Sequence, residues 1–137
     1  MTTTDLPLID IDLAPILFKI QCEGESLNGE PIELVAAEQS YRRFLTLRKM
    51  YPERTLVPSA LIDLVWHYHI LDTRKYMADC QRVFGAYLHH DPYFGLGDDE
   101  DWNANQRGWA DTCQLWQETF GEIIIGHPHR CSSKDCR

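Results

Sequence analysis

The feature that most constrains the fold is a pair of helical repeats separated by a very short break at Asp72 and Thr73. The segments 59–72 and 73–87 each carry apolar side chains at the three- and four-residue spacing of one helix face. So short a connection predicts two neighbouring antiparallel helices, an αα-hairpin. Ser59 and Thr73 are suitable N-caps for the two helices.

The same spacing predicts three further helices, at about residues 10–22, 32–50 and 102–120. Pro31 suits the first turn of the second helix, and the acidic run "DDED" suits the start of the last one. "GESLNGEP" is expected to be a loop, and no useful stretch alternates with period two. The expected fold is therefore all-α, with about five helices in one domain (residues 1–126), the hairpin at its centre and a tail (127–137). Three tryptophans on apolar helix faces should be buried: Trp66, Trp109 and Trp116.

Composition excludes several classes of function. The chain has 137 residues, of which 44% are hydrophobic and 25% charged, as in an ordinary globular domain. No run approaches the roughly 18 apolar residues of a membrane span, and "IDIDLAPILFKI" does not resemble a signal peptide. A net charge of −8 without a basic stripe argues against nucleic acid as a partner. Five cysteines, an odd number, favour reduced thiols and a cytoplasmic location.

Titratable side chains are concentrated around the hairpin. Four of the six histidines lie within 24 residues, from His67 to His90. Asp63 and His67 are one helical turn apart, so the aspartate can orient the imidazole or share a metal ion with it. His69 lies about 200° around the helix from His67, so the two cannot chelate one ion. We expect His67 to be buried, with both ring nitrogens satisfied.

A metal site at this place needs ligands from beyond the first helix. Cys80 lies across the hairpin from His67, and Gly85 with Pro92 would allow "HHDP" to fold back towards Asp63. The candidate ligands for zinc or non-haem iron are then Asp63, His67, Cys80, His89 and His90. The alternatives are a structural Asp–His pair beside solvated histidines, in which Cys80 is a small core residue like Cys22 and Cys113, and a metal-free catalytic site. No residue is assigned a catalytic role.

The tail contains a second candidate group. His127, His129, Cys131 and Cys136 could bind zinc or copper(I), or they could belong to an unstructured end with two reactive thiols. Other chemistry is missing from the sequence: it has no phosphate-binding loop, no G-x-S-x-G and no H-E-x-x-H.

Several motifs together resemble the glycine-rich domain-containing protein-like family, a domain of unknown function in plants, fungi and bacteria. The resemblance spans about Val57 to Gly121. The matching positions are Asp63, Val65-Trp66-His67, His69, Tyr76, Asp79-Cys80, His90-Asp91, Thr112, Leu115-Trp116 and Phe120-Gly121. The chain lacks the glycine-rich region and the added RNA-binding domain of the plant relatives, so the resemblance implies a helical domain without their additional functions. It also implies that His67 is a better ligand candidate than His69, which bacterial relatives often replace.

The leading hypothesis is a small cytoplasmic metal-binding protein, compatible with a metal-dependent enzyme acting on a small molecule or peptide. One alternative is a non-catalytic protein–protein interaction module in which Asp63 and His67 are a structural pair. Another is a metal-delivery or redox role for the His/Cys tail.

Overall fold

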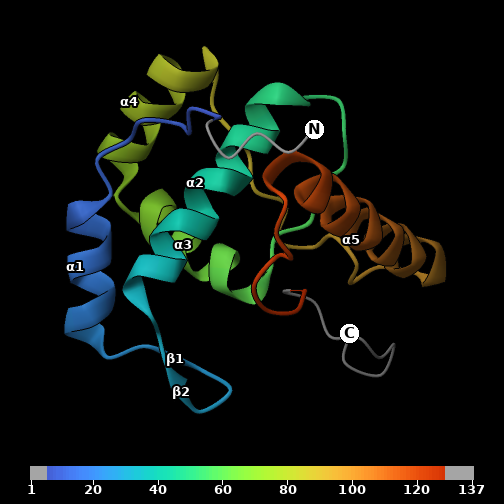
Figure 1. Cartoon of the computed structure of the whole chain (residues 1–137), viewed down its shortest axis with the longest axis horizontal. Helices are drawn as coiled ribbons and strands as arrows, with labels where there is room; N and C mark the ends of the chain where they lie inside the picture. The colour runs from blue at the N-terminus through green and yellow to red at the C-terminus, as the bar shows by residue number, and fades with distance from the viewer. Residues whose placement is uncertain (1–5, 129–137) are drawn as a thin grey trace.

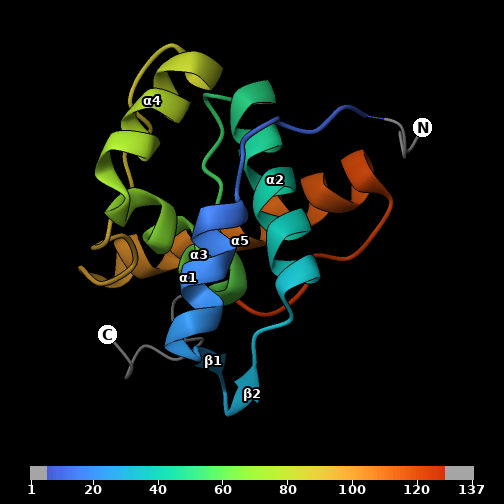
Figure 2. The same ribbon diagram turned by 90° about the vertical axis from the view of Figure 1, so that its left-hand side faces the viewer.

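The computed structural model describes residues 6–128, and within this range the fold is essentially all-α (Figure 1). The helices are α1 (Ala14–Glu23), α2 (Leu34–Met50), α3 (Ala60–Leu71), α4 (Thr73–Phe84) and α5 (Asp99–Phe120). α3 is central and packs against α1, α2 and α4. The predicted fold class and the central hairpin of α3 and α4 are both confirmed. In the view of Figure 2, α1 lies in front of α3.

The two hairpin helices begin differently from each other. The Ser59 side chain accepts a hydrogen bond from the Ile62 amide (3.2 Å), so it caps α3 as predicted. The prediction that Thr73 caps α4 is wrong, because Asp72 occupies the cap position and Thr73 is already helical. α4 ends at Gly85, whose φ of 73° is a left-handed conformation that glycine adopts without strain. The chain can therefore turn back immediately after α4.

The segment before α2 contains a small antiparallel hairpin of β1 (Ser26–Leu27) and β2 (Glu30–Pro31), so the loop prediction is wrong there. Asn28 and Gly29 both have positive φ (52° and 81°), as a two-residue hairpin turn requires. Pro31 lies in β2 and not in a helix. The N-cap of α2 is Glu33, whose carboxylate accepts from the Val35 and Ala36 amides.

The core lies between α3 and the helices around it. Trp66 and Trp116 are buried as predicted, whereas Trp109 is only partly buried against the core. The Val57 amide donates to Thr112 Oγ1 (2.9 Å), which fastens the α2–α3 connection to α5. α5 starts three residues earlier than expected because Asp98 caps it through the Asp101 amide (2.9 Å).

The described chain ends beside the start of α3. The His127 carbonyl accepts from the Ala60 amide (2.8 Å), and the His127 Nε2 atom lies 3.3 Å from Asn28 Nδ2. The other candidate ligands of the tail, His129, Cys131 and Cys136, lie outside the described residues. In residues 6–128, none of the helices combines the length and apolar character that crossing a bilayer demands.

Candidate metal centre

Asp63 and His67 share one face of α3, as their four-residue spacing predicts. The Asp63 side chain is only 3% exposed, and its Oδ2 atom lies 3.1 Å from His67 Nε2. The expectation that His67 is buried is wrong, because its side chain is 46% exposed. The pair therefore consists of a buried carboxylate and an imidazole at the surface.

The third member of the group comes from the loop after α4. His90 Nε2 lies 2.6 Å from Asp63 Oδ1 and 3.2 Å from His67 Nε2. The prediction that "HHDP" folds back to Asp63 is thus confirmed. The His90 side chain is 10% exposed and packs against the Trp66 ring, with centroids 4.3 Å apart.

Buried hydrogen bonds hold the beginning of this loop. The Trp66 indole N–H donates to the Tyr76 hydroxyl (2.9 Å), and this hydroxyl donates to the Leu88 carbonyl (2.5 Å). Leu88 is two residues before His90. The contact therefore ties the position of His90 to both helices of the hairpin.

The other end of the loop is attached to α5. Asp101 Oδ2 accepts from the amides of Gly95 (2.8 Å) and Gly97 (3.0 Å). Asp101 is in the first turn of α5, three residues after the Asp98 cap. The loop that carries His90 is thus fixed at both ends.

Asp63, His67 and His90 can each offer one ligand atom, and these three atoms lie within 4.8 Å of one another. At the usual zinc–ligand distances, two ligand atoms of one ion are separated by about 3.0–3.4 Å. The separations of His67 Nε2 from Asp63 Oδ2 (3.1 Å) and from His90 Nε2 (3.2 Å) fall in this range. The Asp63–His90 distance of 2.6 Å is instead that of a hydrogen bond.

The structure places two predicted ligands outside this group. Cys80 is buried in the core, and His89 is exposed with its ring against Tyr87, at a centroid distance of 4.8 Å. Counting residues across the hairpin suggested that Cys80 would approach His67. His67 instead faces away from α4 towards the surface, and the histidine that points to α4 is His69.

His69 belongs to a separate buried network that the sequence reasoning missed. Its Nδ1 atom lies 2.7 Å from the Tyr41 hydroxyl, its Nε2 atom lies 2.8 Å from Asp79 Oδ2, and Lys75 pairs with the same carboxylate (3.2 Å). Burial lowers the pKa of His69, although the Asp79 carboxylate opposes this shift. A neutral imidazole that accepts from Tyr41 and donates to Asp79 satisfies both nitrogens. The symmetry of the hairpin could have placed His69 beside α4, because residues 69 and 76 are equidistant from the turn and their rings are in contact, with centroids 4.8 Å apart.

The chain matches the model of the UCP032817-like family over residues 13–122. The chain belongs to this family. Two curated relatives are glycine-rich domain-containing proteins 1 and 2 of Arabidopsis thaliana, 34% identical over 111 residues and 31% identical over 127 residues. The alignments cover 76% and 88% of this chain but only 13% and 15% of those relatives. No solved structure gives a significant match.

The resemblance seen in the sequence is thereby confirmed. The matched range contains all three members of the Asp63 group and also Tyr76, which holds the His90 loop. Because the chain spans about one seventh of the relatives' length, the remainder of those proteins has no counterpart in this alignment.

Proposed function

We propose that this domain binds a divalent transition-metal ion, zinc or non-haem iron, at Asp63, His67 and His90. The observation that carries the proposal is the convergence of two imidazoles and one carboxylate, from α3 and from the loop after α4, within 4.8 Å. Two imidazoles with one carboxylate suit catalytic zinc, and they also suit non-haem iron. The group contains no thiolate, which argues against copper(I).

The contacts support a direct ligand role for Asp63. A carboxylate that only orients a ligating histidine binds the ring nitrogen remote from the metal. Asp63 instead faces the Nε2 atoms of both His67 and His90, and these two atoms face each other. All three groups therefore point to one place, and a cation there would be attracted by the buried carboxylate.

Three protein ligands leave coordination positions for water or substrate. The exposure of His67 gives solvent access to this side of the site. An ion there would polarise a bound carbonyl or activate a water molecule, which is the chemistry of a metal-dependent enzyme acting on a small molecule or peptide.

The competing proposal is a structural role. His90 Nε2–H would then donate to Asp63 Oδ1 across 2.6 Å and fasten the loop to α3 without any ion. This alternative would favour the interaction-module hypothesis. The two proposals differ in one measurable quantity, the metal content of the protein.

The test is elemental analysis and metal titration of untagged protein, with Zn²⁺ and with Fe²⁺ under anaerobic conditions. We expect about one ion per chain. His67→Gln and His90→Gln should each lower the affinity by more than about 100-fold, beyond the 10–100-fold effect of losing an orienting group. His89→Gln is the matched control, because it removes the neighbouring exposed imidazole and should retain full affinity. Wild-type protein without metal, or equal losses in the His89 and His90 variants, would contradict the proposal.

A second comparison separates this centre from the tail. Protein truncated after residue 128 lacks His129, Cys131 and Cys136 but retains the three proposed ligands. We expect its metal content to match that of the full chain. Loss of the ion on truncation would favour the tail as the metal-binding element.

A further inference from the structure

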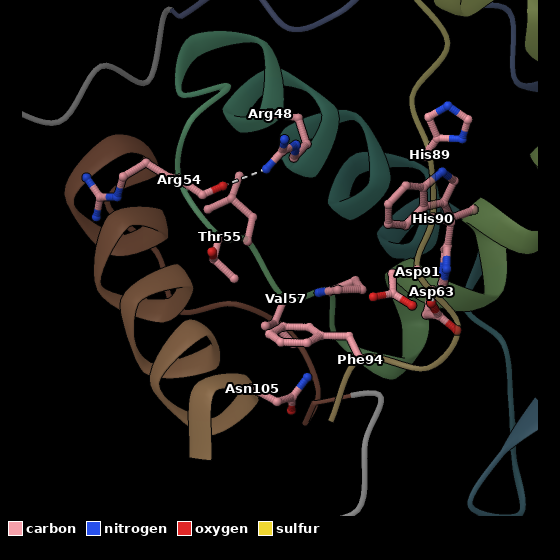
Figure 3. Close-up of a pocket in the computed structure, with 13 residues that line it drawn as sticks. Arg48, Arg54, Thr55, Val57, Asp63, His89, His90, Asp91, Phe94 and Asn105 are labelled. Carbon is pink, nitrogen blue, oxygen red and sulfur yellow. Dashed lines mark hydrogen bonds and ion pairs between the residues drawn. The ribbon is translucent and has the colours of Figure 1, made fainter. Parts of the chain in front are cut away.

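The loop after α4 contributes to two features at once, the candidate metal centre and a pocket beside it (Figure 3). The pocket has a volume of about 300 Å³, and Asp63 and His90 lie together on one side of it. His89, Asp91 and Phe94 of the same loop also line it. The position of this loop therefore determines both the place of a proposed ligand and the shape of the adjoining cavity.

The loop is held from inside the protein through the Tyr76 hydroxyl on α4. This hydroxyl accepts from the Trp66 indole (2.9 Å) and donates to the Leu88 carbonyl (2.5 Å). The Trp66 ring in turn lies against the His90 ring, with centroids 4.3 Å apart. A shift of Tyr76 would therefore move the loop and His90 relative to α3.

The buried His69 side chain joins α3 to α4 next to Tyr76. Its Nε2 atom lies 2.8 Å from Asp79 Oδ2, and Asp79 is three residues after Tyr76 on α4. The His69 ring also packs edge-on against the Tyr76 ring, with centroids 4.8 Å apart and an angle of 88° between the ring planes. His69 thus fixes α4 against α3 at the level of Tyr76.

The His69 imidazole itself is closed to solvent and to ligands. His69 is 1% exposed, and Tyr41, whose hydroxyl lies 2.7 Å from His69 Nδ1, is 0% exposed. Neither residue lines the pocket beside the metal centre. Because neither side chain is accessible, any effect of His69 on the metal centre must be exerted through the protein.

We propose that His69 is a positioning residue for the metal centre, and that it acts through Asp79 and Tyr76 on the loop that carries His90. The contact with Asp79 fixes α4 relative to α3, so that the Tyr76 hydroxyl is in place to hold the loop. The proposal rests on the proposed function, because the affected ion is the one at the candidate metal centre. The position of His90 can nevertheless be measured without any metal.

Two variants break the contact between His69 and α4. His69→Phe keeps a ring against Tyr76 but loses both hydrogen bonds, and Asp79→Leu removes the acceptor while leaving His69 in place. We expect each to lower the zinc affinity by about 2- to 30-fold, as for substitutions that affect a site without touching its ligand. Tyr41→Phe is the matched control, because it removes the other hydrogen bond of the same imidazole and should retain the wild-type affinity.

A double variant tests the route through Tyr76. If His69 acts by placing the Tyr76 hydroxyl, then His69→Phe in a Tyr76→Phe background should cause no further loss of zinc affinity. A general weakening of the core would instead add to the effect of Tyr76→Phe. Additive losses of affinity would therefore overturn the proposed route.

The position of His90 is measured in metal-free protein by NMR. The ring current of Trp66 displaces the signals of the carbon-bound ring protons of His90 from those of a free histidine, because the two rings are in contact. We expect this displacement to be smaller in His69→Phe and Asp79→Leu, and unchanged in Tyr41→Phe. An unchanged displacement in the first two variants when they are folded, or an equal loss in the control, would overturn the proposal.

The two measurements separate this proposal from that of the metal centre. Wild-type protein that binds no zinc would contradict the metal centre, and the NMR signals of His90 would still decide whether His69 positions the loop. Zinc binding by the wild-type protein with unchanged affinity in both His69→Phe and Asp79→Leu would overturn only the role of His69.

Discussion

His90 Nε2 lies 2.6 Å from Asp63 Oδ1, although the two residues are 27 positions apart in the chain. The contact depends on the left-handed turn at Gly85 and on the bond from Tyr76 to the Leu88 carbonyl. The Asp63–His90 contact joins two segments that are distant in the chain, so the geometry of a single helix or strand does not produce it. The candidate centre is thus a product of the tertiary fold, and substitutions that disturb the loop should weaken it even where the ligands are unchanged.

Asp63→Asn should remove the stabilisation that metal provides. A ligand that binds only the folded state adds about 2.7 kcal/mol to the free energy of unfolding at one hundred times its dissociation constant. The asparagine has the same shape but no charge, so zinc at that concentration should leave its melting temperature nearly unchanged. Thermal unfolding with and without zinc measures this effect. An equal zinc-induced shift in both proteins would show that Asp63 is no ligand.

Tyr76→Phe should weaken metal binding without altering any ligand. The variant loses the hydroxyl that links the Trp66 indole to the Leu88 carbonyl, so the position of His90 is less well defined. We expect about 10–100-fold lower affinity, as for other residues that orient ligands. Tyr87→Phe is the control, because the Tyr87 hydroxyl makes no hydrogen bond to residues 6–128. Equal affinities of the two variants in a zinc titration would contradict the role of Tyr76.

Trp116→Ala should destabilise the fold by about 3–5 kcal/mol, the usual cost of removing a core aromatic side chain. Trp116 is 1% exposed and its ring packs on Phe120. Trp109→Ala, on the same helix but only partly buried, should cost clearly less. Urea unfolding of both variants measures the difference. Similar losses would mean that the two tryptophans contribute equally to the core in spite of their different burial.

Stability should fall as the pH rises above about 10, and Tyr41 should contribute to this fall. Burial, followed by the nearby Tyr76, Cys80 and Asp79, raises the pKa of Tyr41 well above its ordinary value. The unfolded chain therefore releases this proton at a lower pH than the folded chain does. Above pH 10 the folded state holds more protons than the unfolded state, and alkali favours unfolding.

Tyr41→Phe removes this contribution. Its stability at neutral pH should be lower, because the Tyr41 hydroxyl no longer bonds His69 Nδ1. Between about pH 9 and 11 its free energy of unfolding should decline less steeply than that of the wild type. Urea unfolding across this range tests the slope. Parallel curves for the two proteins would show that Tyr41 does not titrate as described.

Local patterns were sufficient to predict the helices and two of the three residues of the centre. Apolar spacing located all five helices within a few residues, and the i, i+4 relation placed Asp63 beside His67. The helix ends were harder to predict, because they depend on single residues. Asp72 and not Thr73 occupies the N-cap position of α4, and Glu33 caps α2, so Pro31 precedes this helix and is not in its first turn. The Asn28-Gly29 pair is a hairpin signal, but the two-residue strands beside it are too short for an alternating pattern to indicate them.

Contacts across the fold could be predicted only in part. The return of His90 followed from Gly85 and Pro92, but the choice between His89 and His90 depended on packing against Trp66. The expectation that Cys80 approaches His67 is wrong, because residue counting gives the level of a side chain along the hairpin and not the direction in which it points.

Asp63 and His67 occupy one turn of a packed helix, whereas His90 belongs to a loop held by hydrogen bonds at its two ends. An ion at this place would dissociate in two steps. The loop with His90 would open first, while Asp63 and His67 would still bind the ion. Its residence time would then follow the opening rate of the loop and not the strength of the three bonds together. The exchange rate of the ion would therefore depend on the hydrogen bonds that Tyr76 and Asp101 make, although neither residue contacts the ion.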